Sequence, residues 1–221
     1  MSRNSAKPAS EKTVAKKIAP VKVGIKKPAK KKSDRRVTRT RNILGDAIIQ
    51  LMQEKPFEQI TVQHVLDRAG VSRSTFYTHY SDKNDLFLGD VDDFWEMMST
   101  MLTRRGEKSN RVAPVRELFA HVAEVRDFYS AVVTAGKFHE VMDLGQEHFA
   151  RAIEARLKEM TQARALVPGR RAALAHMFAG ALFSSMAWWI NHGTKETPAH
   201  MDDLYHEMVW ASVGGVGESR K

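Results

Sequence analysis

The sequence predicts an all-α protein made of two helical domains behind a basic N-terminal segment. Three observations support this fold class. After residue 34, apolar residues recur at intervals of three and four, which places them on one face of a helix. Capping Ser, Thr and Asp residues, together with Pro and Gly, separate these stretches. No stretch keeps the period-two alternation of a half-buried strand. We therefore expect about nine helices and no sheet.

Residues 1–34 are distinguished by their charge. They hold eleven Lys and Arg residues against two acidic residues, so their net charge of +9 equals that of the whole 221-residue chain. Residues 35–221 are consequently neutral overall. The segment is rich in Lys, Ala and Pro, and it cannot bury enough apolar surface to offset the entropy of ordering it. The sequence predicts a disordered basic arm over residues 1–34.

Composition excludes several kinds of protein. The chain has no cysteine, which rules out disulfides, thiol nucleophiles and Cys-type zinc sites. The N-terminus lacks the apolar core of a secretory signal, so we expect a cytoplasmic, nucleoid-associated protein. Residues 172–194 contain no Asp, Glu, Lys or Arg, but their strongly apolar part is shorter than the roughly 20 residues that a bilayer requires. We expect a helix buried on most sides and no membrane contact.

Residues 35–88 carry the signals of a compact three-helix domain. A first helix with Thr38 as its N-cap is expected to end at Glu54, before Pro56. A short helix over 61–68 and a second over 73–80, capped by Ser72, are joined through Gly70. Asp82 begins the next helix, with Asp85 in an arrangement like a capping box. Two short helices joined in this way predict a helix-turn-helix.

Residues 89–221 predict a second, larger helical domain. Helices are expected to follow one another after about residue 86, over about 115–125, 128–135, 138–160, 168–190 and 198–213. Gly136, Pro168 and Pro198 mark some of their ends. The domain is large enough to bury its own hydrophobic core.

The segment ITVQHVLDRAGVSRSTFYTHYSDKNDLF, residues 60–87, resembles the DNA-binding domain of the TetR family of bacterial transcriptional regulators. The resemblance rests on the Thr that opens the first short helix, the Ala-Gly-Val turn, Ser72 followed by Phe76-Tyr77, His79-Tyr80, and Lys83 before Leu-Phe. It covers about fifty residues. The C-terminal region resembles one subgroup of the family more loosely.

The residue types in the second short helix suit DNA recognition. Arg73, Ser74 and Thr75 fall in its first turn, where backbone N–H groups favour phosphate and side chains reach the major groove. Arg73 can pair with guanine, and Thr75 can contact a thymine methyl. A solvated, non-contacting Arg73 is the alternative interpretation. Phe76 and Tyr80 follow the apolar period, and we expect them in the core.

The resemblance implies further contacts. Tyr77 and Lys83 occupy positions where the family holds the phosphate backbone, and His79 either shares that role or packs against the next helix. Thr61 and Gln63 would touch the backbone or flanking bases. Specificity would rest mainly on Arg73, Ser74 and Thr75, with Gln63 and Thr78 as further candidates. The full set of expected DNA contacts is Arg41, Thr61, Gln63, Ser72, Arg73, Ser74, Thr75, Tyr77, Thr78, His79 and Lys83.

For residues 89–221, the resemblance implies a ligand-binding and dimerisation domain. The helices over 170–192 and 198–213 would pack with their twofold mates as a four-helix bundle. A hydrophobic effector would bind among the middle helices, although any one Met or aromatic residue at helical spacing belongs more often to the core. The expected pocket residues are Phe94, Trp95, Met98, Phe119, Phe128, Tyr129, Phe138, Met142, Phe149, Met177, Phe178 and Trp188. We expect no metal and no cofactor, because the histidines lack ligand spacing.

These observations favour a homodimeric transcriptional regulator, most simply a repressor that an effector releases from a pseudo-palindromic operator. One alternative is a non-specific, histone-like architectural protein, which the basic arm suggests. Another is a regulator whose C-terminal domain binds a protein partner. The sequence carries no nucleophile elbow, phosphate-binding Gly loop or metal motif, so we expect no enzymatic activity.

Overall fold

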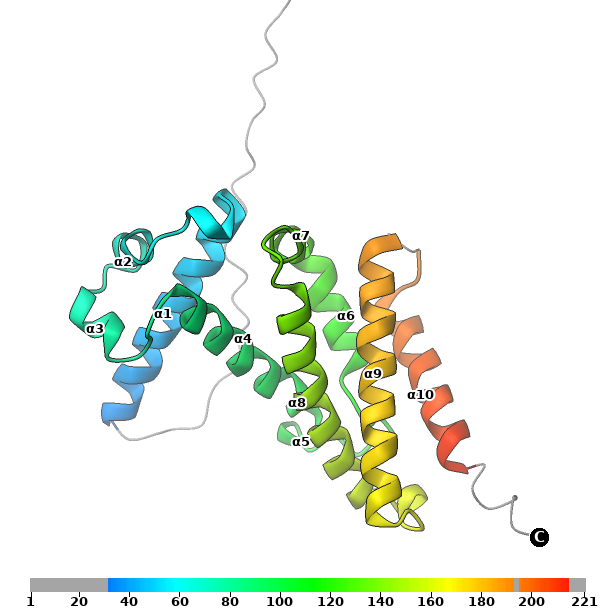
Figure 1. Cartoon of the computed structure of the whole chain (residues 1–221). Coiled ribbons are helices and arrows are strands. Elements are labelled where there is room, and N and C mark those ends of the chain that lie inside the picture. Colours follow the sequence, from blue (N-terminus) through cyan, green and yellow to red (C-terminus); the bar gives the residue numbers. More distant parts are fainter. Residues whose placement is uncertain (1–31, 193–194, 215–221) are drawn as a thin grey trace, which may run out of the picture.

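A computed structural model describes residues 32–192 and 195–214 (Figure 1). Within these residues the chain forms ten α-helices and two short 3₁₀ helices and has no strand. The predicted all-α class is confirmed. The predicted basic arm lies, up to residue 31, outside the described residues. Its last three residues, 32–34, belong to the first helix.

The first helix, α1, spans Lys32–Glu54 and ends before Pro56, as predicted. The expectation that Thr38 caps its N-terminus is wrong, because the helix begins six residues earlier. A 3₁₀ turn, η1, spans Phe57–Gln59, and α2 spans Val62–Ala69. The next helix, α3, spans Arg73–Tyr77 and is shorter than the 73–80 expected. The chain turns at this point so that Tyr80 returns to the core, where 6% of its surface is exposed.

The helix α4 spans Lys83–Ser99 and crosses the boundary expected between residues 88 and 89. Its N-cap is Asp82, whose carboxylate accepts hydrogen bonds from the N–H groups of Asn84 and Asp85. The Asp85 carboxylate accepts from Ser81 rather than from Asp82, so the predicted capping box is displaced by one residue. In Figure 1, α4 runs from α1 to α8, and it packs against both. It therefore joins the two halves of the molecule.

The C-terminal domain continues with α5 (Met101–Arg104), α6 (Val115–Glu124), α7 (Arg126–Thr134), α8 (Phe138–Glu159) and the 3₁₀ turn η2 (Thr161–Ala163). The stripe expected to run from Phe94 to Met101 is interrupted at Thr100, whose hydroxyl donates to the carbonyl of Glu96. Such a bond bends helices. The short α5 that follows accounts for the one helix more than expected.

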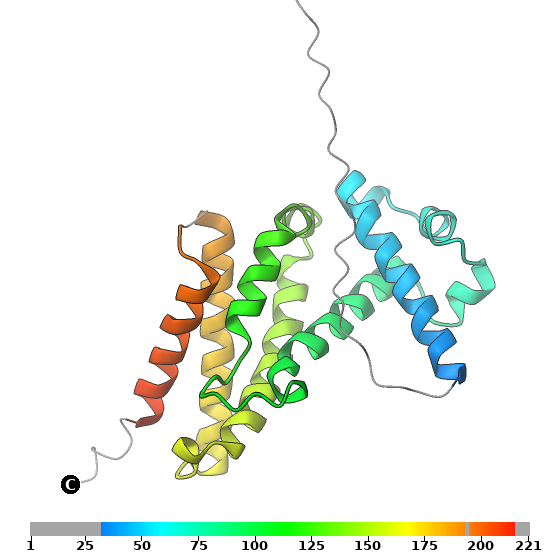
Figure 2. The ribbon, with the colours of Figure 1, turned by 180° about the vertical axis from the view of Figure 1, so that it is seen from behind.

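The last two helices are α9 (Pro168–His192) and α10 (Pro198–Gly214). They lie at the end of the molecule far from α2 and α3, with α10 outermost (Figures 1 and 2). The Tyr205 hydroxyl joins them by donating to the carbonyl of Phe178. By length and composition, α9 could cross a membrane. Its place against α8 instead makes it a bundle helix. It is not buried on most sides, however, because Met177 and Trp188 are exposed.

Ion pairs tie the loop that precedes α6 to α10. The Arg111 guanidinium bonds to the carboxylates of Glu117 and Asp202. Burial alone would lower the pKa of Arg111, but the hydrogen bonds to these carboxylates outweigh it and raise the pKa. Beside it, the Val112 N–H donates to Nε2 of His206 at 3.0 Å. These contacts fix α10 against α6, and they hold the outer helix of the domain in place.

Candidate nucleic-acid interface

The helix α2 begins at a reciprocal cap. The Thr61 hydroxyl accepts from the N–H of His64, and Nδ1 of His64 accepts from the N–H of Thr61, both at 3.2 Å. The capping box normally uses Glu or Gln at the third helical position, and here a histidine supplies the acceptor. The Thr61 side chain is thus committed to the cap, and it fixes where α2 starts on the surface.

The turn between α2 and α3 depends on Gly70. Its φ of 64° lies in the left-handed region that suits glycine, and its N–H donates to the carbonyl of Leu66. Below the turn, the side chains of Val65 and Phe76 are completely buried. The predicted core position of Phe76 is confirmed, as is that of Tyr80. This joint holds α3 across α2, which is the arrangement of a helix-turn-helix.

The side chains at the start of α3 face outward. The Ser72 hydroxyl accepts from the N–H of Thr75 at 3.3 Å and so caps the helix, as predicted. Arg73 and Ser74 are exposed, and Tyr77 exposes 51% of its surface while its ring stands edge-on to Phe76. The second helix of the motif therefore presents one guanidinium and several hydroxyls in a single short turn.

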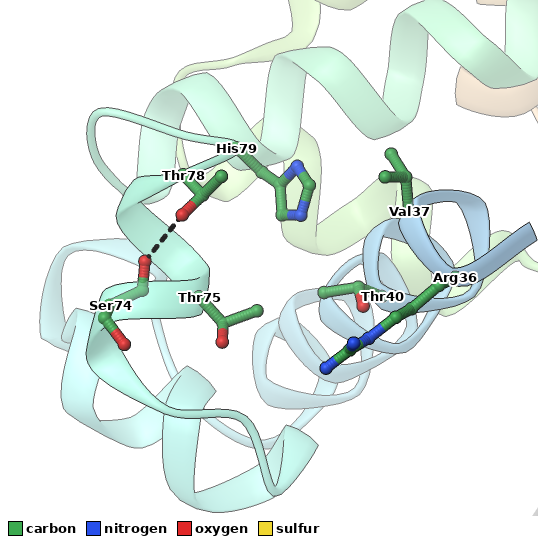
Figure 3. Close-up of a pocket in the computed structure, with 7 residues that line it drawn as sticks. All are labelled: Arg36, Val37, Thr40, Ser74, Thr75, Thr78 and His79. Atoms are coloured by element: carbon green, nitrogen blue, oxygen red, sulfur yellow. Dashed lines mark hydrogen bonds between the residues drawn. The ribbon is translucent and has the colours of Figure 1, made fainter. Parts of the chain in front are cut away.

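A groove of about 280 Å³ separates α3 from the N-terminal half of α1 (Figure 3). It is lined by Arg36, Val37, Thr40, Ser74, Thr75, Thr78 and His79. In Figure 3, the Thr75 and His79 side chains point toward α1, and the Thr78 hydroxyl donates to the carbonyl of Ser74 at 2.9 Å. The sequence reasoning missed Arg36 and Thr40. Their i, i+4 spacing on a helix next to the basic arm was the available signal.

Two of the expected contacts lie elsewhere. Arg41 holds α1 to α4, because its Nε donates to the Tyr80 hydroxyl at 3.1 Å and its guanidinium pairs with Asp93 at 3.3 Å. The hydrogen bond to Tyr80 raises the pKa of Arg41. Arg41 thus joins helices while 38% of its side chain is exposed, and its contact with DNA stays a prediction.

The second of these expected contacts is Lys83, at the start of α4. Its ammonium donates to the carbonyls of Phe57, Glu58 and Ile60 at 2.6, 3.3 and 2.8 Å. It also lies 4.5 Å from the centroid of the Phe57 ring. An ammonium has three N–H donors, and here three carbonyls receive them. Lys83 therefore ties the segment between α1 and α2 to α4, and its contact with phosphate stays a prediction.

The expected pocket residues of the C-terminal domain fall into two groups. Trp95, Met98, Phe119, Tyr129, Met142, Phe149 and Phe178 are buried, and Phe94, Phe128 and Phe138 are partly buried. Met177 and Trp188 instead expose 66% and 46% of their surfaces on the outside of α9. They cannot line a pocket within one copy of the described chain, because they face away from its core.

The buried group is closely packed at its centre. The Trp95 ring stands edge-on to Phe149 and Phe183, with ring centroids 6.1 and 5.2 Å apart, and its Nε1 donates to the carbonyl of Val141. Gly145 on α8 lets these rings approach the helix backbone. The burial of Tyr129 raises its pKa. Among the described residues, no cluster of three or more His, Asp and Glu is placed to hold a metal.

These features define a helix-turn-helix DNA-binding protein with a separate helical domain. A family model described as bacterial regulatory proteins, tetR family, matches residues 44–89, and one described as a transcriptional regulator C-terminal region matches residues 114–209. The chain belongs to the TetR family of transcriptional regulators. As a member of this family, it is a DNA-binding transcriptional regulator and not an enzyme.

Two relatives are similar in sequence. The HTH-type regulator YxbF of Bacillus subtilis is 23% identical over 174 residues, which cover 74% of this chain and 43% of YxbF. An HTH-type regulator of Haemophilus influenzae is 35% identical over 65 residues, covering 29% of this chain and 32% of that protein. This chain therefore spans less than half the length of either relative.

Solved structures share the fold over nearly their full length. A TetR regulator from Streptococcus agalactiae has a TM-score of 0.55 at 23% identity, covering 80% of this chain and 97% of that one. The dihydroxyacetone kinase operon activator DhaS has a TM-score of 0.56 at 16% identity, with coverage of 79% and 96%. At these identities the likeness shows the fold alone.

Proposed function

We propose that this protein is a homodimeric repressor that binds a pseudo-palindromic operator and leaves it when a hydrophobic effector binds. The observation that carries the proposal is a set of exposed apolar side chains on α9 and α10, at the end opposite the helix-turn-helix. Met177 and Trp188 on α9, and Leu204 and Met208 on α10, expose between 39% and 66% of their surfaces. Exposed apolar surface commonly marks a site of association, and we call these four residues the apolar face.

The dimer would form through this face. Around Met177 and Trp188, α9 carries small residues, including Ala173 and Ser184, that allow two helices to approach closely. On α10, Leu204 and Met208 lie one turn apart. The helices expected from the sequence, 170–192 and 198–213, are those that carry the face. Pairing two copies across it would give the four-helix bundle and would set two DNA-binding regions on a twofold axis.

The DNA contacts would come from the outward-facing residues of α2 and α3 and from Arg36 and Thr40 of α1. Arg73, Ser74, Thr75 and Thr78 would read base edges, with Gln63 beside them. The phosphate backbone would lie along Tyr77, His79 and the groove, where Arg36 and Thr40 face it. Thr61 and Ser72 would contribute mainly by capping helices whose N-terminal N–H groups face phosphate. Arg41 and Lys83 are left out of the contact set.

Effector control would pass through α4. One end of this helix carries Lys83 and the cap at Asp82, and the other carries Trp95 in the aromatic core of the C-terminal domain. A ligand among the partly buried rings, such as Phe94 and Phe128, would press on α4. Because a helix moves as a rigid body, such a shift would change the position of the helix-turn-helix. The spacing of the two DNA-binding regions would change in turn.

The basic arm would add bulk affinity for DNA, and the protein would act in the cytoplasm on the nucleoid. Residues 35–88 carry eight basic and six acidic side chains, so this domain is barely basic. Residues 35–88 would determine the sequence preference, and the basic arm would supply the salt-dependent affinity.

Footprinting of the purified protein on the DNA upstream of its own gene tests the proposal. We expect two protected half-sites related by symmetry, about 34–36 Å or one further helical turn apart. Protection without a preferred sequence would favour the architectural alternative. Co-purification of a stoichiometric protein bound to the C-terminal domain would favour the partner-binding one. Because one protein of this fold is described as an operon activator, a reporter gene behind the protected site tests repression separately.

A further inference from the structure

We propose that Asp67 is a specificity-determining residue that acts on Arg73 through the side-chain amide of Gln63. The proposal rests on the proposed function in one respect, namely that Arg73 reads a base. The three side chains form a hydrogen-bonded chain from α2 to the first residue of α3. Asp67 was not among the DNA contacts expected from the sequence.

The geometry of the chain is continuous. Nε2 of Gln63 donates to Oδ1 of Asp67 at 2.8 Å, and the Arg73 guanidinium donates to Oε1 of Gln63 at 3.1 Å. Gln63 and Asp67 are four residues apart on α2, which puts their side chains on the same face. All three residues are exposed, on the side of the domain where α3 begins.

The charges at the two ends orient the amide between them. A guanidinium has only donors, and an ionised carboxylate has only acceptors. The Gln63 oxygen must therefore face Arg73, and its NH₂ group must face Asp67. The reversed amide would place donor against donor and acceptor against acceptor. Asp67 thus determines which atom Gln63 presents to Arg73, although it does not touch Arg73 itself.

This arrangement matters for recognition because Arg is a flexible side chain. Its rotamer entropy is large, and part of it is lost on binding. Holding the guanidinium before DNA arrives reduces that loss. The bond to Gln63 uses one of five N–H donors, which leaves a pair for a guanine. The neighbouring Arg68 does not compete for Asp67, because it pairs with Glu54 at 2.7 Å.

The Asp67 carboxylate has a second consequence. It places a negative charge on the surface that approaches phosphate, which opposes binding to any sequence. The positioning of Arg73 favours binding to the correct sequence. Asp67 therefore weakens non-specific binding and strengthens the preference for one base pair. Its removal should raise the non-specific affinity and lower the preference at that base pair. A merely structural residue would lower both together.

The test uses the full-length protein and the site that it selects from random DNA. Each base pair of one half-site is changed in turn, and affinities are measured for wild type and the Asp67→Ala, Gln63→Ala and Arg73→Ala variants. We expect Asp67→Ala and Gln63→Ala to lower the preference at the base pair read by Arg73 by about 3- to 10-fold. Asp67→Ala should leave the other positions unchanged, whereas Gln63→Ala should also lower the preference at any base pair that Gln63 contacts directly. Non-specific affinity should rise for Asp67→Ala and not for Gln63→Ala.

At the base pair read by Arg73, the double variant Asp67→Ala/Gln63→Ala should lose no more preference than either single variant, because the two residues act in series. Asp67→Asn, which keeps an acceptor but removes the charge, should retain part of the preference. Asp46→Ala, at an exposed carboxylate on α1, controls for the change in charge and should leave the preference unchanged at each position.

Additive losses at the base pair read by Arg73, or a loss in Asp67→Ala at a base pair that Arg73→Ala does not affect, would overturn the inference. So would an unchanged preference in Asp67→Ala. A wild-type protein that selects no sequence would instead refute the proposed function, and that outcome is seen before any variant is made.

Discussion

The helix caps of the DNA-binding domain and the bonds that hold the C-terminal domain together differ in the sequence distance that they span. In the first, the caps are local: Thr61 bonds to His64, Ser72 to Thr75 and Asp82 to Asp85, each within three residues. In the second, the decisive bonds join distant segments. Arg111 reaches Asp202 across 91 positions, and Trp95 reaches Val141 across 46. The helix boundaries of the first domain can therefore be predicted from short stretches of sequence. The bonds of the second domain depend on how its helices pack.

The largest effect on stability should come from adding a methyl group where aromatic rings contact the backbone of α8 in the C-terminal core. In Gly145→Ala, the added methyl group would meet the Phe183 ring and lie 2.8 Å from Trp95. We expect the free energy of unfolding to fall by about 3 kcal/mol or more, as for overpacked cores. Urea unfolding followed by tryptophan fluorescence measures it.

The matched control is Gly180→Ala on α9, where the new methyl group would meet only Nε2 of Gln146 at 3.9 Å. This variant should be neutral or more stable by about 0.5–1 kcal/mol, because Ala favours the helix. Equal stabilities for the two variants would show that the aromatic centre is loosely packed. The C-terminal domain would then not depend on close packing between its helices.

A smaller effect should follow from removing the Lys83 ammonium. Lys83→Met keeps the stem but leaves three carbonyls without their donor, and we expect a loss of about 1–3 kcal/mol in the free energy of unfolding. The dependence of DNA binding on salt should keep its slope, since the ammonium is already engaged. The measurement is affinity for one operator across a series of salt concentrations.

Arg36→Ala serves as the comparison for Lys83→Met. Arg36 lines the groove, so its loss should lower the salt slope by about one. If Lys83→Met lowered the slope by the same amount, Lys83 would be a phosphate contact after all, as the family resemblance implied.

Deletion of the basic arm should affect all DNA alike. Removing residues 2–31 keeps α1, which begins at Lys32. We expect binding to weaken by about tenfold at low salt and the salt slope to flatten, because basic side chains no longer displace counterions. Preference for the selected site should be unchanged in competition assays. Loss of that preference would mean that the arm reads a groove.

The smallest effect is a pH dependence of stability in the C-terminal domain. Burial lowers the pKa of His206 below its usual 6.5. The unfolded chain then binds more protons than the folded one, so stability is fully present above pH 6.5 and falls as the pH drops. Protonation at Nε2 would also break the bond from the Val112 N–H. Urea unfolding at pH 7.5 and 5.5 should show the decrease.

In His206→Asn, the difference between the two pH values should shrink. It should not vanish, because burial also lowers the pKa of His121. An unchanged difference would place the titration elsewhere and would leave the His206 bond without a role in stability.

How far the sequence predicted each domain follows from this contrast. The turn at Gly70, the caps at Ser72 and Asp82, and the buried Phe76 were all predicted, because each rests on a backbone preference or on helical spacing within a few residues. The start of α1 was not, because three residues with arm-like composition extend the helix. Arg36 and Thr40 were missed, because the groove exists only where α1 crosses α3.

By itself, the sequence determined the all-α fold, the helix-turn-helix and the outward placement of Arg73, Ser74 and Tyr77. Local hydrogen bonds and apolar periodicity are sufficient for those features. Only the tertiary structure decided which cations bond within the protein. Arg41 and Lys83 were both expected to contact DNA, and they bond to Tyr80 and Ile60, which lie 39 and 23 positions away. It also decided that Met177 and Trp188 face out while Trp95 fills the core. Apolar spacing identifies a buried face, but not what covers it.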